Sequence, residues 1–106
     1  MDPMTVGDAA RQTGWSARML RYLERTALVV PPRSASGYRL YGLLELNQLR
    51  SLGELRRRFH VEIAELAFAA RLRREPDLRA AVDTWFAADT DALEWEQRKH
   101  ERLLAA

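Results

Sequence analysis

Gly14 separates two short helical patterns in the segment TVGDAARQTGWSARMLRYL, and this arrangement constrains the fold more than any other feature of the chain. Glycine readily adopts the left-handed conformation that ends one helix and lets the chain enter the next. Ala10, Gly14 and Leu20 have the spacing of a helix-turn-helix motif: a small residue where the helices cross, a glycine in the turn, and an aliphatic anchor. The sequence therefore predicts helices over residues 6–12 and 17–26, joined by a tight turn.

Both predicted helices begin with residues that cap helices well. Thr5 precedes Asp8 by three residues, a spacing that resembles a capping box. Ser16 stands directly before the second helix, where its side-chain oxygen can accept a backbone N–H. Trp15 and Leu20 have the spacing of a hydrophobic staple around that cap. These signals define where each helix starts.

The second predicted helix has an apolar face and a basic face. At about 100° per residue, its apolar side comprises Met19, Leu20, Leu23 and Ala27. The opposite side comprises Arg18, Arg21, Tyr22 and Arg25. In a helix-turn-helix the second helix lies in the major groove of DNA, so the basic face would contact DNA, which is a polyanion. The alternative is a solvated stripe with weak contacts between successive turns.

The segment after this helix, VVPPRSASGYRLY, predicts a small β-hairpin. Two prolines end the helix, and a Ser-Gly turn separates two short β-prone runs. We expect Val29 and Val30 to pair with residues 38–41. Alternation along the second run places Tyr38 and Leu40 on one side and Arg39 and Tyr41 on the other. Such a hairpin is the wing of a winged helix-turn-helix, whereas the alternative is an ordinary loop.

Leucines recur at three-residue spacing from Gly42 onward and predict a third helix with an apolar stripe. The stripe expected to be core comprises Leu43, Leu46, Leu49, Leu52 and Leu55, widened by Leu44 and Phe59. The chain turns near His60, and a fourth helix carries Ile63, Leu66, Ala67 and Ala70. Three arginines at residues 56–58 end the third helix, where positive charge suits the helix dipole as well as it suits a phosphate.

Residues 76–106 predict one long helix or two shorter ones, starting near Pro76. Asp91 and Glu94 have capping-box spacing, which would separate two helices near residues 89–91. The broken apolar stripe of this segment comprises Leu78, Val82, Trp85, Phe86, Leu93 and Leu103. Large aromatic residues on such a segment either dock onto the preceding helices or meet a partner. We favour a second copy of the chain, with Leu78, Val82, Trp85, Phe86 and Leu93 as the dimerisation residues.

Charge is divided along the chain, whose net charge is +2. Residues 1–75 have 13 basic and 8 acidic side chains, whereas residues 76–106 have 4 basic and 7 acidic ones. A polyanion would attract the first part and repel the second. The sequence therefore predicts a DNA-binding domain over residues 1–75 and a helical dimerisation or docking segment over residues 76–106.

Catalytic and metal-binding patterns are missing from the sequence. It has no cysteine, and its two histidines, His60 and His100, have no partner at metal-ligand spacing. There is no phosphate-binding glycine loop and no Ser-His-Asp arrangement, so we expect neither an enzyme nor a metal or cofactor site. No apolar run approaches about 18 residues, and no signal-peptide pattern opens the chain. We expect a cytoplasmic protein that does not contact membranes.

Two motifs resemble the DNA-binding domain of the mercury-resistance-type (MerR) family of transcriptional regulators. These are LRYLE at residues 20–24 and GYRLY at residues 37–41, in the order and at the spacing of that family. The resemblance covers about residues 4–75. It implies a mainly α fold: a winged helix-turn-helix with a small β-hairpin wing, a helical pair, and a C-terminal helix that forms an antiparallel coiled coil between two subunits.

The resemblance also implies roles for individual residues. Arg18 and Arg21 would face the groove and the DNA backbone, Tyr22 would reach a phosphate, and Arg39 would touch the flanking backbone. Phosphate contacts set the register of the protein on DNA, and Arg18 is the side chain expected to read a base edge. The full expected DNA-binding set is Ser16, Arg18, Arg21, Tyr22, Arg25, Arg33, Ser36, Tyr38 and Arg39. The implied partners are double-stranded DNA, a second copy of the chain, and RNA polymerase at promoters.

The sequence departs from the family pattern at three positions. Leu23 replaces a second tyrosine, Ala27 occupies the position of a glycine after the second helix, and His60 lies where glycine is common. We also expect no effector-binding domain and therefore no ligand-triggered switch. A transcriptional regulator is the leading hypothesis. An architectural or excisionase-like recombination factor and a protein-binding adaptor are the alternatives.

Overall fold

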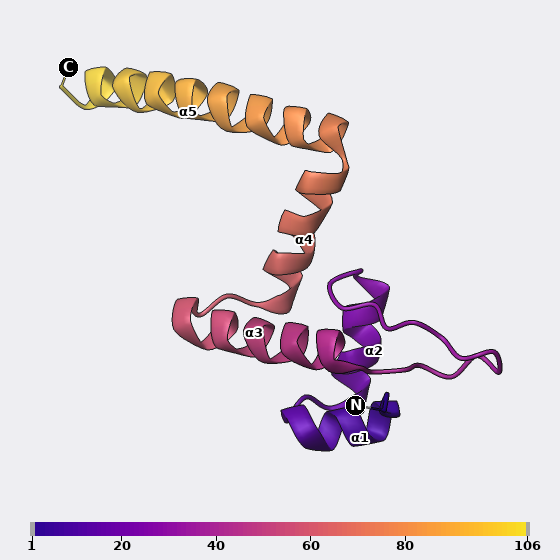
Figure 1. Ribbon diagram of the computed structural model, residues 1–106. Helices are drawn as coiled ribbons and strands as arrows, with labels where there is room; N and C mark the ends of the chain where they lie inside the picture. The colour runs from indigo at the N-terminus through magenta and orange to yellow at the C-terminus, as the bar shows by residue number, and fades with distance from the viewer. Residues whose placement is uncertain (1, 106) are drawn as a thin grey trace. The chain divides into compact units, whose positions relative to one another are not determined.

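The computed structural model describes residues 2–105, with the backbone alone for residues 89–93. The described chain is mainly helical, which confirms the mainly α part of the predicted fold class. Its helices are α1 (Val6–Thr13), α2 (Ala17–Arg25), α3 (Leu43–Phe59), α4 (Ile63–Arg74) and α5 (Pro76–Ala105), as shown in Figure 1. The chain divides into two compact units, Met1–Ala70 and Arg71–Ala106, with the boundary between them inside α4.

The first two helices and their turn form as the sequence predicts. Thr5 caps α1, where its hydroxyl accepts the Asp8 N–H at 3.2 Å. Gly14 ends α1 with φ +81°, and its N–H donates to the Ala10 carbonyl at 3.0 Å. Because φ lies in the left-handed region there, a residue without a Cβ suits this turn. The chain can then enter α2 after only two further residues.

Ser16 caps α2 through a hydrogen bond in which the Met19 N–H donates to Ser16 Oγ at 3.1 Å. The helix ends at Arg25, one residue before the predicted end, and Thr26 closes it with an N–H bond to the Tyr22 carbonyl at 3.0 Å. Ala27 follows with φ +61°, a left-handed conformation that disfavours residues with a Cβ. The exit from α2 is therefore strained at Ala27.

A single hydrophobic core lies in the first unit. Its buried members are Ala9, Leu20, Leu23, Val29, Tyr41, Leu46, Leu49 and Ile63. They come from α1, α2, α3, the start of α4 and the segment between α2 and α3. The core therefore fixes α2 against α1 and α3 from one side, and Ala9, rather than the predicted Ala10, is the fully enclosed small residue of α1.

The predicted leucine stripe of α3 is wrong for most of its members. Leu46 and Leu49 are buried and Leu52 is partly buried. The other four members, which are Leu43, Leu44, Leu55 and Phe59, are exposed. A step of three residues turns only about 300° around a helix, so a stripe at that spacing drifts by about 60° per step. Only its central members can face one core.

Glu45 holds the start of α3 in place, and Trp15 ties the helix-turn-helix to α3. Glu45 is a buried carboxylate whose Oε1 accepts the Gly42 N–H at 2.9 Å, closing the start of α3. The Trp15 indole N–H donates to the Leu49 carbonyl at 2.9 Å, and Arg56 lies 5.6 Å from the centroid of the Trp15 ring. The helix-turn-helix is thereby tied to α3 by a specific hydrogen bond as well as by core packing.

The segment between α2 and α3 does not pair as predicted. Val29 is buried and its N–H donates to the Leu23 carbonyl at 3.3 Å, while Val30 is exposed. Tyr41 forms an isolated antiparallel bridge with Met4, with N–O distances of 2.7 and 2.9 Å. The predicted pairing of Val29 and Val30 with residues 38–41 is therefore wrong. The two prolines that follow these valines have no N–H to donate to a ladder.

A shorter antiparallel turn, closed by Arg33 and Arg39, forms within this segment instead of the predicted hairpin. An isolated bridge joins Arg33 to Arg39, and the Ser34 N–H donates to the Tyr38 carbonyl at 2.8 Å. Gly37 allows the reversal with φ +88°. The two ends of the returning run differ in burial, because Tyr38 is 73% exposed and Tyr41 is fully buried, while Arg39 and Leu40 between them are both partly buried. The turn therefore carries its polar side chains outside the core.

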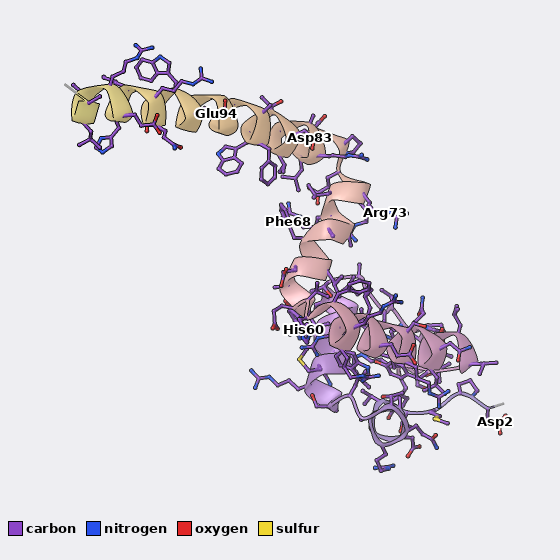
Figure 2. All side chains as sticks on the ribbon, turned by 90° about the vertical axis from the view of Figure 1, so that its left-hand side faces the viewer. Asp2, His60, Phe68, Arg73, Asp83 and Glu94 are labelled. Carbon is purple, nitrogen blue, oxygen red and sulfur yellow. The ribbon has the colours of Figure 1, made fainter. Side chains whose placement is uncertain are left out.

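The second unit is dominated by α5, which is one helix rather than two. Its side chains stand out along the helix in Figure 2, where Asp83 and Glu94 mark two positions. Trp85 and Phe86 are 58% and 61% exposed, and their rings meet edge to face with centroids 5.1 Å apart. Leu78 and Val82 are half-buried, and the predicted side chains of Asp91 and Leu93 lie outside the described residues.

Candidate nucleic-acid interface

α2 separates its side chains into a buried face and a basic face. Leu20 and Leu23 are buried in the core, while Arg18, Arg21 and Arg25 are exposed. The predicted apolar face holds for α2 itself, although Ala27 lies beyond the end of the helix and is exposed. Because the core holds one face of α2, the arginines are presented from a rigid support.

Tyr22 lies beside these arginines and is partly buried against the core. The guanidinium carbon of Arg25 lies 5.7 Å from the centroid of the Tyr22 ring, within the range of a cation–π contact. This contact holds Arg25 against the helix surface. The two side chains therefore form one continuous patch at the carboxyl end of α2.

Three further predicted residues lie at the start of α2 and on the turn. Ser16 is exposed and its Oγ caps α2, which leaves the hydroxyl hydrogen able to donate to a phosphate. Ser36 and Tyr38 are exposed on the turn between α2 and α3. The structure therefore presents all three to solvent.

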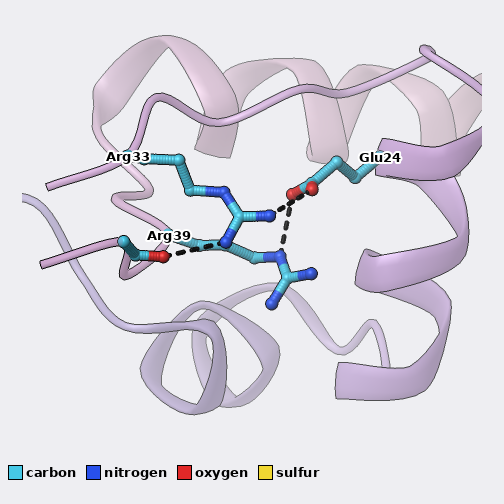
Figure 3. Close-up of polar contacts among 4 residues, drawn as sticks. Glu24, Arg33 and Arg39 are labelled. Carbon is cyan, nitrogen blue, oxygen red and sulfur yellow. Dashed lines mark hydrogen bonds and ion pairs between the residues drawn. The ribbon is translucent and has the colours of Figure 1, made fainter.

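Arg33 and Arg39 meet at one carboxylate, that of Glu24 on α2 (Figure 3). Arg33 Nη2 donates to Glu24 Oε1 at 2.6 Å, and Arg39 Nε donates to Glu24 Oε2 at 2.8 Å. Arg33 Nη1 also donates to the Gly37 carbonyl at 2.9 Å. These bonds attach the turn after α2 to α2 itself. We call Glu24, Arg33 and Arg39 the Glu24 cluster.

The pKa of the Glu24 carboxyl is lowered in the folded chain. Burial alone would raise the pKa of the Glu24 carboxyl, but hydrogen bonds from Arg39 and Arg33 outweigh burial and lower that pKa below its ordinary value. Glu24 therefore remains charged, and one negative charge faces two positive ones.

Sequence reasoning missed Glu24 as a structural residue, although a signal was present. Glu24 is the only acidic residue between Asp8 and Glu45, and it lies among five arginines in residues 16–41. A lone carboxylate in a basic segment has a strong electrostatic reason to pair. The sequence could therefore have identified a partner for the basic side chains without naming which arginines it holds.

The remaining basic and titratable candidates lie around the end of α3. Arg56 is 3.7 Å from the Glu62 carboxylate, and Arg58 lies 5.1 Å from the Phe59 ring centroid. His60 ends α3 with φ +55°, which supports its predicted position at a helix end. Within the described residues, no group of three or more His, Cys, Asp or Glu side chains could hold a metal ion. None of the helices, over that same part of the chain, is long and apolar enough to cross a membrane.

Comparisons with known proteins match the part of the chain that contains these features. The family described as MerR HTH family regulatory protein matches residues 4–68. The HTH-type transcriptional regulator CueR of Salmonella typhi is 41% identical over 54 residues, which are 50% of this chain and 39% of CueR. The HTH-type transcriptional regulator HmrR of Rhizobium leguminosarum bv. viciae is 29% identical over 98 residues, which are 92% of this chain and 74% of HmrR.

A further relative, heavy metal-dependent transcription regulator 2 of Rhizobium meliloti, is 40% identical over 48 residues, which are 44% of this chain and 33% of that protein. The match to CueR spans about two fifths of the length of that relative. The family match contains the entire helix-turn-helix, the Glu24 cluster and α3. The chain therefore belongs to the MerR family of helix-turn-helix transcriptional regulators.

Proposed function

We propose that this chain binds specific double-stranded DNA sequences as part of a transcriptional regulator, with α2 in the major groove. The observation that carries the proposal is the division of α2, whose Leu20 and Leu23 are buried while Arg18 and Arg21 are exposed. A helix held from behind by a core can enter a groove without losing its support. CueR and HmrR, both HTH-type transcriptional regulators by name, support this assignment.

The arginines of α2 have different roles in this proposal. Arg18 lies in the first turn of α2, the part of a recognition helix that reaches base edges, and it reads a base. Arg21 and Tyr22 bind phosphates. The turn between α2 and α3, which carries Arg33, Ser36, Tyr38 and Arg39, acts as a wing against the flanking backbone. Ser16 and Arg25 complete the contact at the two ends of α2.

Titration of DNA at several salt concentrations tests these roles. We expect Arg21→Ala to weaken binding to cognate and random DNA alike and to make the salt dependence shallower, by about 0.9 in the logarithmic slope, because one phosphate contact is lost. Arg18→Ala should cost about 1–3 kcal/mol, mainly on the cognate site. Arg79→Ala, at an exposed position of α5, is the control that removes the same charge elsewhere.

Equal losses for Arg18→Ala on cognate and random DNA would reject Arg18 as a base reader. If wild-type protein shows no salt-dependent DNA binding, the proposed function itself is wrong. Since the cognate sequence is selected from random duplexes by the wild-type protein, the same selection supplies both DNA substrates.

We further propose that α5 pairs with α5 of a second copy. Leu78, Val82, Trp85 and Phe86 fall within an arc of about 100° on α5. The exposed Leu103 and Leu104 fall in the same arc near the end of the helix. Glu96 and His100 fall in the same arc between these two groups, so the stripe is broken and the helix–helix contact has an apolar region at each end of α5. Two half-sites bound by one dimer gain the effective-concentration advantage of bivalent binding.

Sedimentation of the full chain tests the dimer. We expect the wild type to sediment as a dimer and the double variant Trp85→Ala, Phe86→Ala to sediment as a monomer. Trp95→Ala is a matched control, because Trp95 is 62% exposed on α5 but falls outside the arc, beneath Lys99. A wild-type monomer at high concentration, with and without DNA, would reject the dimer.

The proposed partners are thus double-stranded DNA, a second copy, and RNA polymerase at the promoters that the dimer occupies. Transcription in a purified system with the selected DNA placed in a promoter tests the last of these. A change in transcript yield that disappears with Arg18→Ala would support regulation by this chain. Unchanged yield with wild-type protein bound at the promoter would reject it.

A further inference from the structure

The Glu24 cluster uses its two arginines unequally. Arg33 is bonded through both terminal nitrogens, with Nη2 on Glu24 Oε1 and Nη1 on the Gly37 carbonyl. Arg39 is bonded through Nε alone, and within the part of the chain that the structure describes its terminal nitrogens make no hydrogen bond. In Figure 3 these terminal nitrogens lie on the side of the guanidinium away from Glu24. The two residues therefore differ in what they can still bind.

A guanidinium held by Nε keeps its outer edge free. Arginine has five N–H donors in a rigid plane, so a bond at Nε orients the remaining four without using them. The Glu24 side chain is 19% exposed, and that of Arg39 is 26% exposed, so both are held near the surface without being fully solvated. The free edge of Arg39 can receive an anion with two oxygens, as phosphate does.

Arg33 connects the turn to α2 through two hydrogen bonds. Its two bonds join the start of the turn, at Arg33, to Gly37 within the turn and to Glu24 on α2. The bond to Gly37 spans four residues and the bond to Glu24 spans nine. Each of these bonds uses one of the two N–H groups on a terminal nitrogen of Arg33, whereas within the described residues all four terminal N–H groups of Arg39 remain. Arg33 therefore holds the turn with both of its terminal nitrogens, and Arg39 keeps the larger share of its donors for DNA.

We propose that Glu24 is a positioning residue for DNA binding, which holds Arg39 with its terminal nitrogens toward a phosphate while Arg33 braces the turn without contacting DNA. The inference rests on the proposed DNA-binding function. It explains how a carboxylate is accommodated on a surface that meets a polyanion, because two guanidinium groups outweigh its charge. It also divides two arginines that sequence reasoning had placed together as DNA contacts.

The salt dependence of DNA binding separates the two arginines. We expect Arg39→Ala to make the logarithmic salt slope shallower by about 0.9, the value for one lost phosphate contact. Arg33→Ala should weaken binding to the selected site while leaving the salt slope unchanged. A shallower slope for Arg33→Ala, equal to that of Arg39→Ala, would overturn the division of roles.

A double-mutant cycle tests the role of Glu24. We expect Glu24→Gln, which keeps the shape of the side chain, to weaken binding to the selected site by about threefold to tenfold. This loss should largely vanish in the Arg39→Ala background, because the residue that Glu24 positions is then absent. Glu24→Gln and Arg18→Ala should be additive, which is the control for a general loss of structure. Far-UV circular dichroism and the melting temperature show that each variant is folded.

Additive losses for Glu24→Gln and Arg39→Ala would overturn the inference while leaving the proposed function intact. If instead the wild-type chain shows no salt-dependent binding to duplex DNA, the proposed function fails first and this inference fails with it. The slope of Arg33→Ala remains an independent test if Glu24→Gln does not fold.

Discussion

Ala27 should make the chain less stable than it would be with glycine at the same position. Ala27 has φ +61°, is exposed, and follows the last turn of α2, where its N–H donates to the Glu24 carbonyl at 3.0 Å. The left-handed conformation costs a residue with a Cβ about 1–2 kcal/mol. The substitution Ala27→Gly removes this strain and keeps the backbone hydrogen bond.

Glycine also increases the conformational entropy of the unfolded chain, which offsets part of the gain by about 0.4–1 kcal/mol. We therefore expect Ala27→Gly to raise the free energy of unfolding by about 0.5–1 kcal/mol. For a unit of this size, 1 kcal/mol shifts the melting temperature by about 4–8 °C. The expected increase is accordingly about 2–8 °C.

Thermal unfolding followed by circular dichroism measures this effect, with Ala69→Gly as the matched control. Ala69 is exposed within α4, where the helical backbone favours alanine, so the same substitution should cost about 0.5–1 kcal/mol there. Opposite signs at the two positions would support the reasoning. A lower melting temperature for Ala27→Gly would refute it, because no other contact of the Ala27 side chain needs to be replaced.

Two further predictions concern buried groups. Tyr41→Phe should leave stability unchanged or raise it by up to about 1 kcal/mol in urea unfolding, because the buried Tyr41 hydroxyl has no hydrogen-bond partner among the described residues. Tyr38→Phe, on an exposed side chain, is its control, and a clear loss of stability for Tyr41→Phe would contradict the prediction. The lowered pKa of Glu24 means that its stabilising contribution is present above the ordinary value of 4.5 and is lost as pH falls through the folded-state pKa. Thermal unfolding across that range should therefore show a weaker acid-induced decline for Glu24→Gln than for wild type, and equal declines would count against it.

The helix-turn-helix was predictable because its signals are local. Thr5 determines where α1 begins, Gly14 where it ends and Ser16 where α2 begins. Each acts through contacts within four residues, and the structure has each of them as expected. The division of α2 into two faces follows from helical periodicity alone. These elements need no knowledge of the rest of the chain.

The turn after α2 could not be predicted in the same way. Tyr41 pairs with Met4, a partner 37 residues away, and Val29 is used by the core instead of by a strand. Neither contact has a signal in the neighbouring residues. The exposed leucines of α3 show the same limit, since hydrophobic spacing says that a helix forms but not which of its leucines meets the core.

Glu24 shows a limit of another kind. Its charge and its isolation among arginines were visible in the sequence, but the choice of Arg33 and Arg39 over Arg21 and Arg25 depends on the path of the turn. A pairing decided by tertiary geometry becomes assignable only when the backbone is known.

The hydrogen bond from the Trp15 indole N–H to the Leu49 carbonyl affects the fluorescence of the chain. Indole emission shifts with the polarity around the ring, and Trp15 is partly buried with its N–H bonded, whereas Trp85 and Trp95 are about 60% exposed on α5. In the proposed dimer, Trp85 alone among the three would change its surroundings on association. Fluorescence from chains that retain one tryptophan each would then report unfolding of the first unit through Trp15, association through Trp85, and an unchanging solvated baseline through Trp95.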